Sequence, residues 1–130
     1  LREHGGVSLW FIEVKSSTPH TEGENIHDYL NEIAQKFSSS LLLFYSAFLN
    51  RPSTPANVLP AKFLSIKMPT TQIRPVLVVK RLHKDHINSL QDKLNIMTAH
   101  LRSACSMDPP LVLGLEKAIE LFRVAEHVPV

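Results

Sequence analysis

Two charged residues stand in a segment that is otherwise apolar. Residues 7–15 read Val-Ser-Leu-Trp-Phe-Ile-Glu-Val-Lys, which predicts a strand, and its charges are Glu13 and Lys15. Side chains two apart in a strand leave the same face, so a carboxylate and an ammonium can serve one site. Glu13, with the main-chain carbonyl of Val14, can ligate a hard cation such as Mg²⁺, which prefers oxygen ligands. Lys15 can orient a metal-bound water or stabilise charge building on a phosphate.

The competing interpretation is an ordinary ion pair between Glu13 and Lys15 at the solvated end of the strand. Charge is costly inside an apolar strand, but the tripeptide Glu-x-Lys is common by chance. Here it ends a hydrophobic strand and precedes Ser16-Ser17 and a predicted helix. The sequence is therefore compatible both with a functional site and with an ordinary ion pair at Glu13 and Lys15.

Composition sets the limits of the interpretation. A chain of 130 residues fits a single domain, 1–130, with one sizeable core. The net charge of +2 permits nucleic-acid binding but does not argue for it. The single cysteine, Cys105, cannot form an internal disulfide, which favours an intracellular location. This location is the cytoplasm or, if the protein is eukaryotic, the nucleus. The longest apolar run covers residues 41–45, far short of the roughly 20 that span a bilayer, so no membrane partner is expected.

Strand and helix patterns alternate along the chain. Gly5-Gly6 predicts a hairpin turn before the strand at 7–15, and residues 16–24 are typical of a loop. We then expect a helix at 25–50, a loop at 51–60, a short helical turn within 61–68, a strand at 73–80, a helix capped by Asp85 and ending near 105, a strand at 111–114 and a helix at 115–124. This order predicts an α/β domain with a small mixed central sheet flanked by helices.

The predicted helix at 85–105 carries a seven-residue apolar repeat. It consists of Ile87, Leu90, Leu94, Met97, Leu101 and Ala104. A repeat of this length in a small domain favours a helix lying on a sheet. The alternative is a coiled-coil seam, which would make the helix the contact for a homodimer or a protein partner.

Around the Glu-x-Lys pair the chain resembles the PD-(D/E)xK, restriction-endonuclease-like nuclease superfamily. The residues that carry the resemblance are 11–17, Phe-Ile-Glu-Val-Lys-Ser-Ser. The order of hairpin, Glu-x-Lys strand, helix, strand and helix is similar over most of the chain. The resemblance implies a restriction-endonuclease-like core and hydrolysis of a nucleic-acid phosphodiester with Mg²⁺ or Mn²⁺. DNA is the expected substrate and RNA the alternative.

The resemblance also assigns roles to individual residues. Glu13 would be a metal ligand, and Lys15 the water-positioning base or charge stabiliser. Many members add a polar residue from the following helix, for which Glu32, Gln35 and Lys36 are the candidates. Each of these three is equally credible as part of a solvated helix face.

One part of the family pattern is missing, namely the aspartate that supplies a second metal ligand from the preceding strand. A two-residue turn at Gly5-Gly6 places His4 opposite Val7, Glu3 opposite Ser8 and Leu1 opposite Trp10. The partner of Glu13 would then fall before Leu1, so we expect a domain that lacks its first strand or an upstream segment. A protein that never had this ligand is equally compatible. The alternative function is therefore a catalytically inactive nuclease-fold module that binds a protein or nucleic acid.

Basic residues gather at the end of the predicted strand 73–80. Lys80, Arg81 and Lys84 are candidates for phosphate contact, with a solvated sheet edge as the alternative. His83 and His86 have a spacing that can suit a metal, but no cysteine pair or His-Glu-x-x-His motif accompanies them. We expect these two to be surface histidines.

Overall fold

The computed structural model of the protein describes residues 2–3, 6–19, 24–49, 63, 66–67 and 70–126. Its strands are β1 (Arg2–Glu3), β2 (Gly6–Ser17), β3 (Gln72–Arg81) and β4 (Leu111–Gly114). Its helices are α1 (Glu24–Phe48), α3 (Ile87–Met97), α4 (Ala99–Cys105) and α5 (Leu115–Glu126), with a short 3₁₀ turn, η2 (Lys84–His86), before α3. No helix in these ranges is long and apolar enough to cross a membrane.

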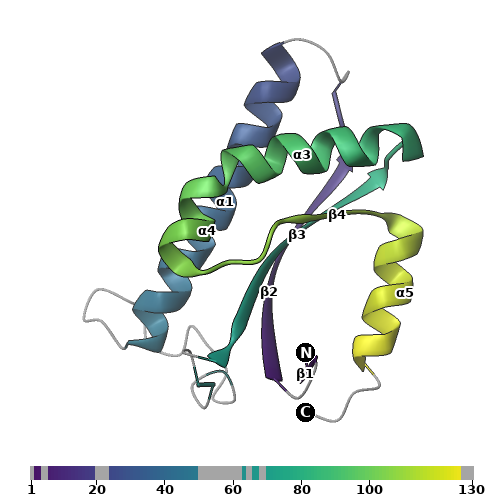
Figure 1. The fold of residues 1–130 in the computed structure, drawn as a ribbon. Coiled ribbons are helices and arrows are strands. Elements are labelled where there is room, and N and C mark those ends of the chain that lie inside the picture. The colour runs from purple at the N-terminus through teal and green to yellow at the C-terminus, as the bar shows by residue number, and fades with distance from the viewer. Residues whose placement is uncertain are drawn as a thin grey trace.

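Three parallel strands make most of the sheet. β2, β3 and β4 lie side by side in this order and all run parallel (Figure 1). Parallel neighbours need a crossover connection, and α1 lies in the first crossover while α3 and α4 lie in the second. β1 adds only a two-residue antiparallel arm at the beginning of β2.

The α/β class is confirmed, but the expected mixed, restriction-endonuclease-like sheet is wrong for the described residues, in which β2, β3 and β4 are all parallel. The expected hairpin register is also wrong. Arg2 pairs with Val7 and Glu3 with Gly6, so the residue opposite Val7 is Arg2 rather than His4, an offset of two positions. The reason is that Gly6 enters β2 as its first residue instead of serving in the turn.

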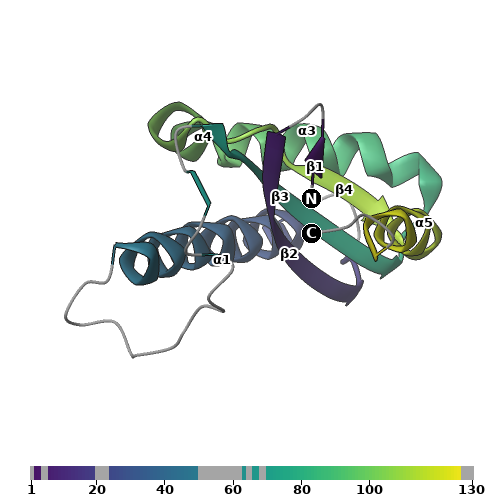
Figure 2. The same cartoon turned by 90° about the horizontal axis from the view of Figure 1, so that it is seen from below.

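Helices cover both faces of the sheet unequally. α1 and α3 pack on the face that carries Leu77 and Val79 of β3, and α5 packs on the face that carries Val76 and Val78. Figure 2 shows α5 across the sheet from α1. The side of α1 that faces the sheet is an unbroken buried stripe of Ile26, Leu30, Ile33, Phe37, Leu41 and Phe44. This is the amphipathic pattern that predicted the helix.

The predicted helix at 85–105 is present in two pieces that meet at Thr98. Thr98 is fully buried, and its hydroxyl donates a hydrogen bond to the carbonyl of Leu94 over 2.9 Å. The predicted Asp85 cap is wrong, because Asp85 lies in η2 and the residue preceding α3 is His86, which makes no side-chain capping bond.

The apolar repeat of these helices packs inside the chain. Leu90 and Leu94 are buried against α1 and β3, and Leu101 is buried beside Ile73. The helix-on-sheet interpretation is therefore confirmed for these leucines, which a coiled-coil seam would have needed on the surface. A homodimer or protein partner bound through the helix at 85–105 stays a prediction.

Most other element boundaries agree with the expected ones. β4 has the predicted bounds, β2 and β3 extend slightly beyond theirs, α1 begins one residue earlier, and α5 continues to Glu126. The predicted loop at 51–60 lies outside the described residues, as does the turn at 61–68 except for positions 63, 66 and 67.

The centre of the core can be tested at Leu77, which is fully buried in the central strand. Leu77→Ala is expected to lower the free energy of unfolding by about 2–5 kcal/mol, because a cavity replaces packed methyl groups. Urea denaturation measures the change. Ile96→Ala is the matched control, since Ile96 is 74% exposed on α3 and its loss should cost less than about 0.5 kcal/mol. Equal effects of the two changes would contradict the packing described.

Candidate functional site

The alternation of β2 divides its side chains between two environments. Leu9 and Phe11 point toward α1, where the Phe11 ring meets the Phe44 ring with centroids 5.9 Å apart. Glu13 and Lys15 have the same parity and reach the same face. Their side chains are 23% and 22% exposed, so both lie at the border of the core with access to water.

Helix α1 supplies two further charges at this position. Glu32 and Lys36 are four residues apart and therefore neighbours on one side of the helix. The Lys36 Nζ donates a hydrogen bond to Glu13 Oε1 over 2.9 Å, and Lys15 Nζ donates one to Glu32 Oε1 over 3.3 Å. Each strand charge is thus bound to the opposite charge on the helix.

The four side chains form one cluster, which we call the charge cluster: Glu13, Lys15, Glu32 and Lys36. The remaining distances between opposite charges are 3.6 Å from Lys36 Nζ to Glu32 Oε1 and 3.9 Å from Lys15 Nζ to Glu13 Oε1. Each lysine therefore lies within ion-pair distance of both carboxylates, and the formal charges cancel. The contact between Glu13 and Lys15 is the longest of the four, so the simple two-residue ion pair does not describe this site.

The charge cluster shifts the titration of its helix members. The hydrogen bond from Lys15, with the positive charges of Lys15 and Lys36, lowers the pKa of Glu32. The hydrogen bond to Glu13, with the negative charge of that carboxylate, raises the pKa of Lys36. Both shifts favour the ionised forms of these two helix residues.

Tyr29 of α1 lies under the charge cluster and was not identified from the sequence. Its ring centroid is 5.9 Å from Lys15 Nζ, close enough for a cation–π attraction. Burial, followed by the negative charges of Glu13 and Glu32, raises the pKa of Tyr29 to about 12. The hydroxyl is buried and has no hydrogen-bond partner among the described residues. The available signal was its position three residues before Glu32, on the same side of α1.

The other predicted site residues lie apart from this cluster. Gln35 is exposed on α1, and within the described part of the chain the hydrogen bonds of the cluster join Lys36 to Glu13 and Lys15 to Glu32, without Gln35. The side chain of Val14 leaves the opposite face of the sheet and is 51% exposed. The role of its main-chain carbonyl as a metal ligand stays a prediction.

Strand alternation also separates the three basic candidates. Arg81 is opposite Ser17 in the register and shares a face with Lys15. Lys80 has the other parity, and Lys84 lies in η2; all three are exposed. Only Arg81 of the three is therefore on the strand face that carries the charge cluster.

The rings of the two histidines lie beside each other at a tilt of 43° beyond the end of β3. The rings of His83 and His86 have centroids 5.6 Å apart, and His83 Nδ1 is 3.4 Å from Asp85 Oδ2. His83 is exposed and His86 is half-buried. Within the ranges that the structure covers, no three His, Cys, Asp or Glu side chains gather as a metal-binding group.

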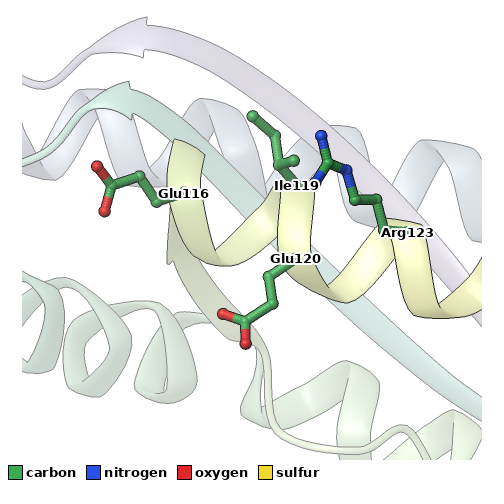
Figure 3. Close-up of a pocket in the computed structure, with 4 residues that line it drawn as sticks. All are labelled: Glu116, Ile119, Glu120 and Arg123. Carbon is green, nitrogen blue, oxygen red and sulfur yellow. The ribbon is translucent and has the colours of Figure 1, made fainter.

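An open hollow lies on α5, away from the charge cluster. Its lining is Glu116, Ile119, Glu120 and Arg123. Figure 3 shows that these side chains leave the helix in different directions. Since all four come from one helix on the opposite face of the sheet, the hollow brings together none of the predicted site residues.

No protein-family model, no curated protein and no solved structure matches this chain.

The pKa of Tyr29 provides a test of the described geometry. The folded protein keeps a phenolic proton that the unfolded chain releases above its ordinary pKa of 10.0, so this residue's contribution to stability is lost as pH rises from about 10 to about 12. Burial also raises the pKa of Tyr45, so the two tyrosines are separated by single substitutions. The ultraviolet absorbance of phenolate in Tyr45→Phe should show one transition near pH 12, which belongs to Tyr29, and Tyr29→Phe should remove that transition and keep that of Tyr45. A transition of Tyr45→Phe near the ordinary value of pH 10 would contradict the described burial of Tyr29.

Proposed function

We propose that the charge cluster is the active site of a metal-dependent enzyme that hydrolyses nucleic-acid phosphodiesters, of the PD-(D/E)xK type, with DNA as the expected substrate. The observation that supports it best is the convergence of two carboxylates from different elements on the same two lysines. Glu13 comes from β2 and Glu32 from α1. Carboxylates and ammonium groups held together near water are the groups that hydrolysis of a phosphodiester requires.

The donor set fits Mg²⁺ or Mn²⁺. Mg²⁺ is commonly held by one or two carboxylates and completes its shell with water and substrate phosphate oxygens. Glu13 and Glu32 would provide the two carboxylates, because their Oε1 atoms lie within 4 Å of the same ammonium nitrogens. The ion, when bound, would neutralise phosphate charge and lower the pKa of a bound water.

Each neighbouring side chain has a defined part in this proposal. Lys15 is oriented by Glu32 and by the ring of Tyr29, so its ammonium can stabilise negative charge on the scissile phosphate. Tyr29 stays neutral at physiological pH because its pKa is about 12, and its hydroxyl can donate a hydrogen bond. Arg81, exposed on the same face of the sheet, can contact a neighbouring phosphate.

The second candidate is a catalytically inactive module that binds a protein or nucleic acid. The observation that favours it is the internal neutrality of the charge cluster, in which both carboxylates already have lysine partners. A ligand of either charge must compete with these contacts. In this case the cluster connects β2 to α1, and binding uses another surface.

A metal-binding measurement distinguishes a metal site at the charge cluster from a purely structural ion-pair network. Titration with Mg²⁺ or Mn²⁺, followed by isothermal calorimetry, should show saturable binding that Glu13→Gln and Glu32→Gln each weaken by about tenfold or more. Glu116→Gln on α5 is the control, because this carboxylate is exposed and lies outside the cluster. Absence of binding at millimolar metal, or equal binding by Glu13→Gln, would refute the metal site.

Cleavage separates the two candidate functions. Lys15→Ala is expected to reduce hydrolysis of DNA by on the order of a hundredfold or more, because the charge on the phosphate loses its stabilising ammonium. Its circular dichroism should match that of the parent protein. Lys117→Ala removes an ion-paired lysine of α5 instead and should leave the rate unchanged. Activity that survives Lys15→Ala would rule out the mechanism, and metal binding without cleavage would favour the inactive module.

A further inference from the structure

The outer edge of β2 is long and open. β2 has 12 residues, and β1 pairs only with Gly6 and Val7 at its beginning. β3 occupies the other side of the strand from Ser8 to Ser17. Along residues 9–17, no strand within the described ranges pairs with the outer edge, so the main-chain groups there can accept another strand.

The opposite edge of the sheet is protected. β4 has only four residues, and the side-chain oxygen of Gln91 accepts a hydrogen bond from the Val112 main-chain N–H over 3.2 Å. Short edge strands and covered N–H groups are the usual protection against strand addition. Between Leu9 and Ser17, β2 has no proline, and its one lysine, Lys15, is turned toward α1 and bound to Glu32.

The face of β2 opposite the charge cluster is apolar and accessible. Ile12 is 46% and Val14 51% exposed, although aliphatic side chains at these positions of a strand are usually covered. The described helix on this face, α5, packs on Val76 and Val78 of β3 through Ala118 and reaches β2 at Trp10, whose ring centroid lies 6.2 Å from that of Phe122. The open edge therefore continues into exposed apolar side chains, which favours contact with another protein surface.

We propose that a second copy of this chain pairs with β2 along this edge, antiparallel and centred on Val14. Two identical antiparallel strands related by a two-fold axis pair residues of the same parity. With the axis at Val14, Glu13 of each copy lies opposite Lys15 of the other. Residue 11 then faces residue 17, so seven residues of each copy, 11–17, form the ladder.

The other symmetric registers are less favourable for the same two charges. An axis at Glu13 or at Lys15 sets like charges directly opposite each other, which destabilises an antiparallel pair. An axis at Ile12 sets Glu13 opposite Phe11 and Lys15 opposite Leu9, and an axis at Phe11 leaves both charges opposite apolar or small residues. Charge complementarity therefore selects the Val14-centred register, in which a second copy of the strand complements the first.

This dimer needs neither metal nor substrate, but its register rests on Glu13 and Lys15, which also belong to the proposed active site. It joins strands β2, β3 and β4 of the two copies into one continuous sheet and brings Val14 of the two copies into contact. Each of the two charges keeps its partner on α1 and gains an opposite charge across the strands, which adds to the stability of such a pair.

Oligomeric state is the first test. Sedimentation equilibrium of the parent protein should give the mass of a dimer, and Val14→Lys should raise the dissociation constant by about tenfold or more, because like charges then meet on the axis. Ile96→Lys is the control, since it changes an equally aliphatic exposed residue on α3 and should leave the dimer intact. A monomeric parent protein, or a Val14→Lys variant as dimeric as the parent, would overturn the proposal.

Disulfide trapping tests the register. In a Cys105→Ser background, Val14→Cys should form an intermolecular disulfide on oxidation, because the two substituted positions face each other within bonding distance. Ile12→Cys should not, because each copy's position 12 lies opposite position 16 of the other. Crosslinking of Ile12→Cys without crosslinking of Val14→Cys would overturn the Val14-centred register.

Discussion

The parallel pairing of β2 with β3 determines where Glu13 and Lys15 can find oppositely charged partners. β3 is buried on both faces from Ile73 to Val79 apart from Arg74. The neighbouring strands therefore lie beside apolar side chains of β3. The register places Glu13 opposite Leu77 and Lys15 opposite Val79. Neither charge has a polar residue directly opposite it on β3. Both must find partners above the sheet, and α1 is the helix that covers this position.

Burial of the α1 stripe then fixes which helix residues meet the strand. Ile33 and Phe37 are buried in the core, and each directly follows a member of the charge cluster, Glu32 and Lys36. With the apolar side chains anchored, the preceding residues are rotated to the border of the core, within reach of β2. Hydrophobic packing thus brings Glu32 and Lys36 of α1 opposite Lys15 and Glu13 of β2. The ion pairs themselves add little stability, because their groups are partly exposed.

The sequence was sufficient for the parts of the structure that depend on local periodicity. The stripe of α1 predicts a helix with nearly the observed bounds, and the alternation of β2 correctly places Glu13 and Lys15 on one face. It was insufficient where the outcome depends on residues far apart in the chain. The parallel direction of β4, the hairpin register and the approach of Lys36 to Glu13 over 23 positions are set by tertiary packing.

Residue type and spacing were misleading guides to the ends of the helices near Asp85 and Thr98. Asp85 has the residue type of a helix cap, but η2 precedes α3 and takes this residue into its own turn. Thr98 stands within an unbroken apolar repeat, yet its buried hydroxyl bonds to the carbonyl of Leu94 at the point where the helix divides. Such side-chain bonds to the preceding turn compete with regular helix. Sequence spacing alone does not reveal which of these bonds forms.

The unequal exposure of the two lysines determines how the charge cluster can receive a ligand. Lys36 makes the shortest contact to Glu13, 2.9 Å, but its side chain is 46% exposed, whereas that of Lys15 is 22% exposed. Lys15 is also held by the ring of Tyr29. Because a long exposed side chain regains rotamer freedom when it leaves a surface pair, Lys36 is the partner that a ligand of the carboxylates can displace. Lys15 would stay beside the freed carboxylates, where the proposed hydrolysis of a phosphodiester would use it.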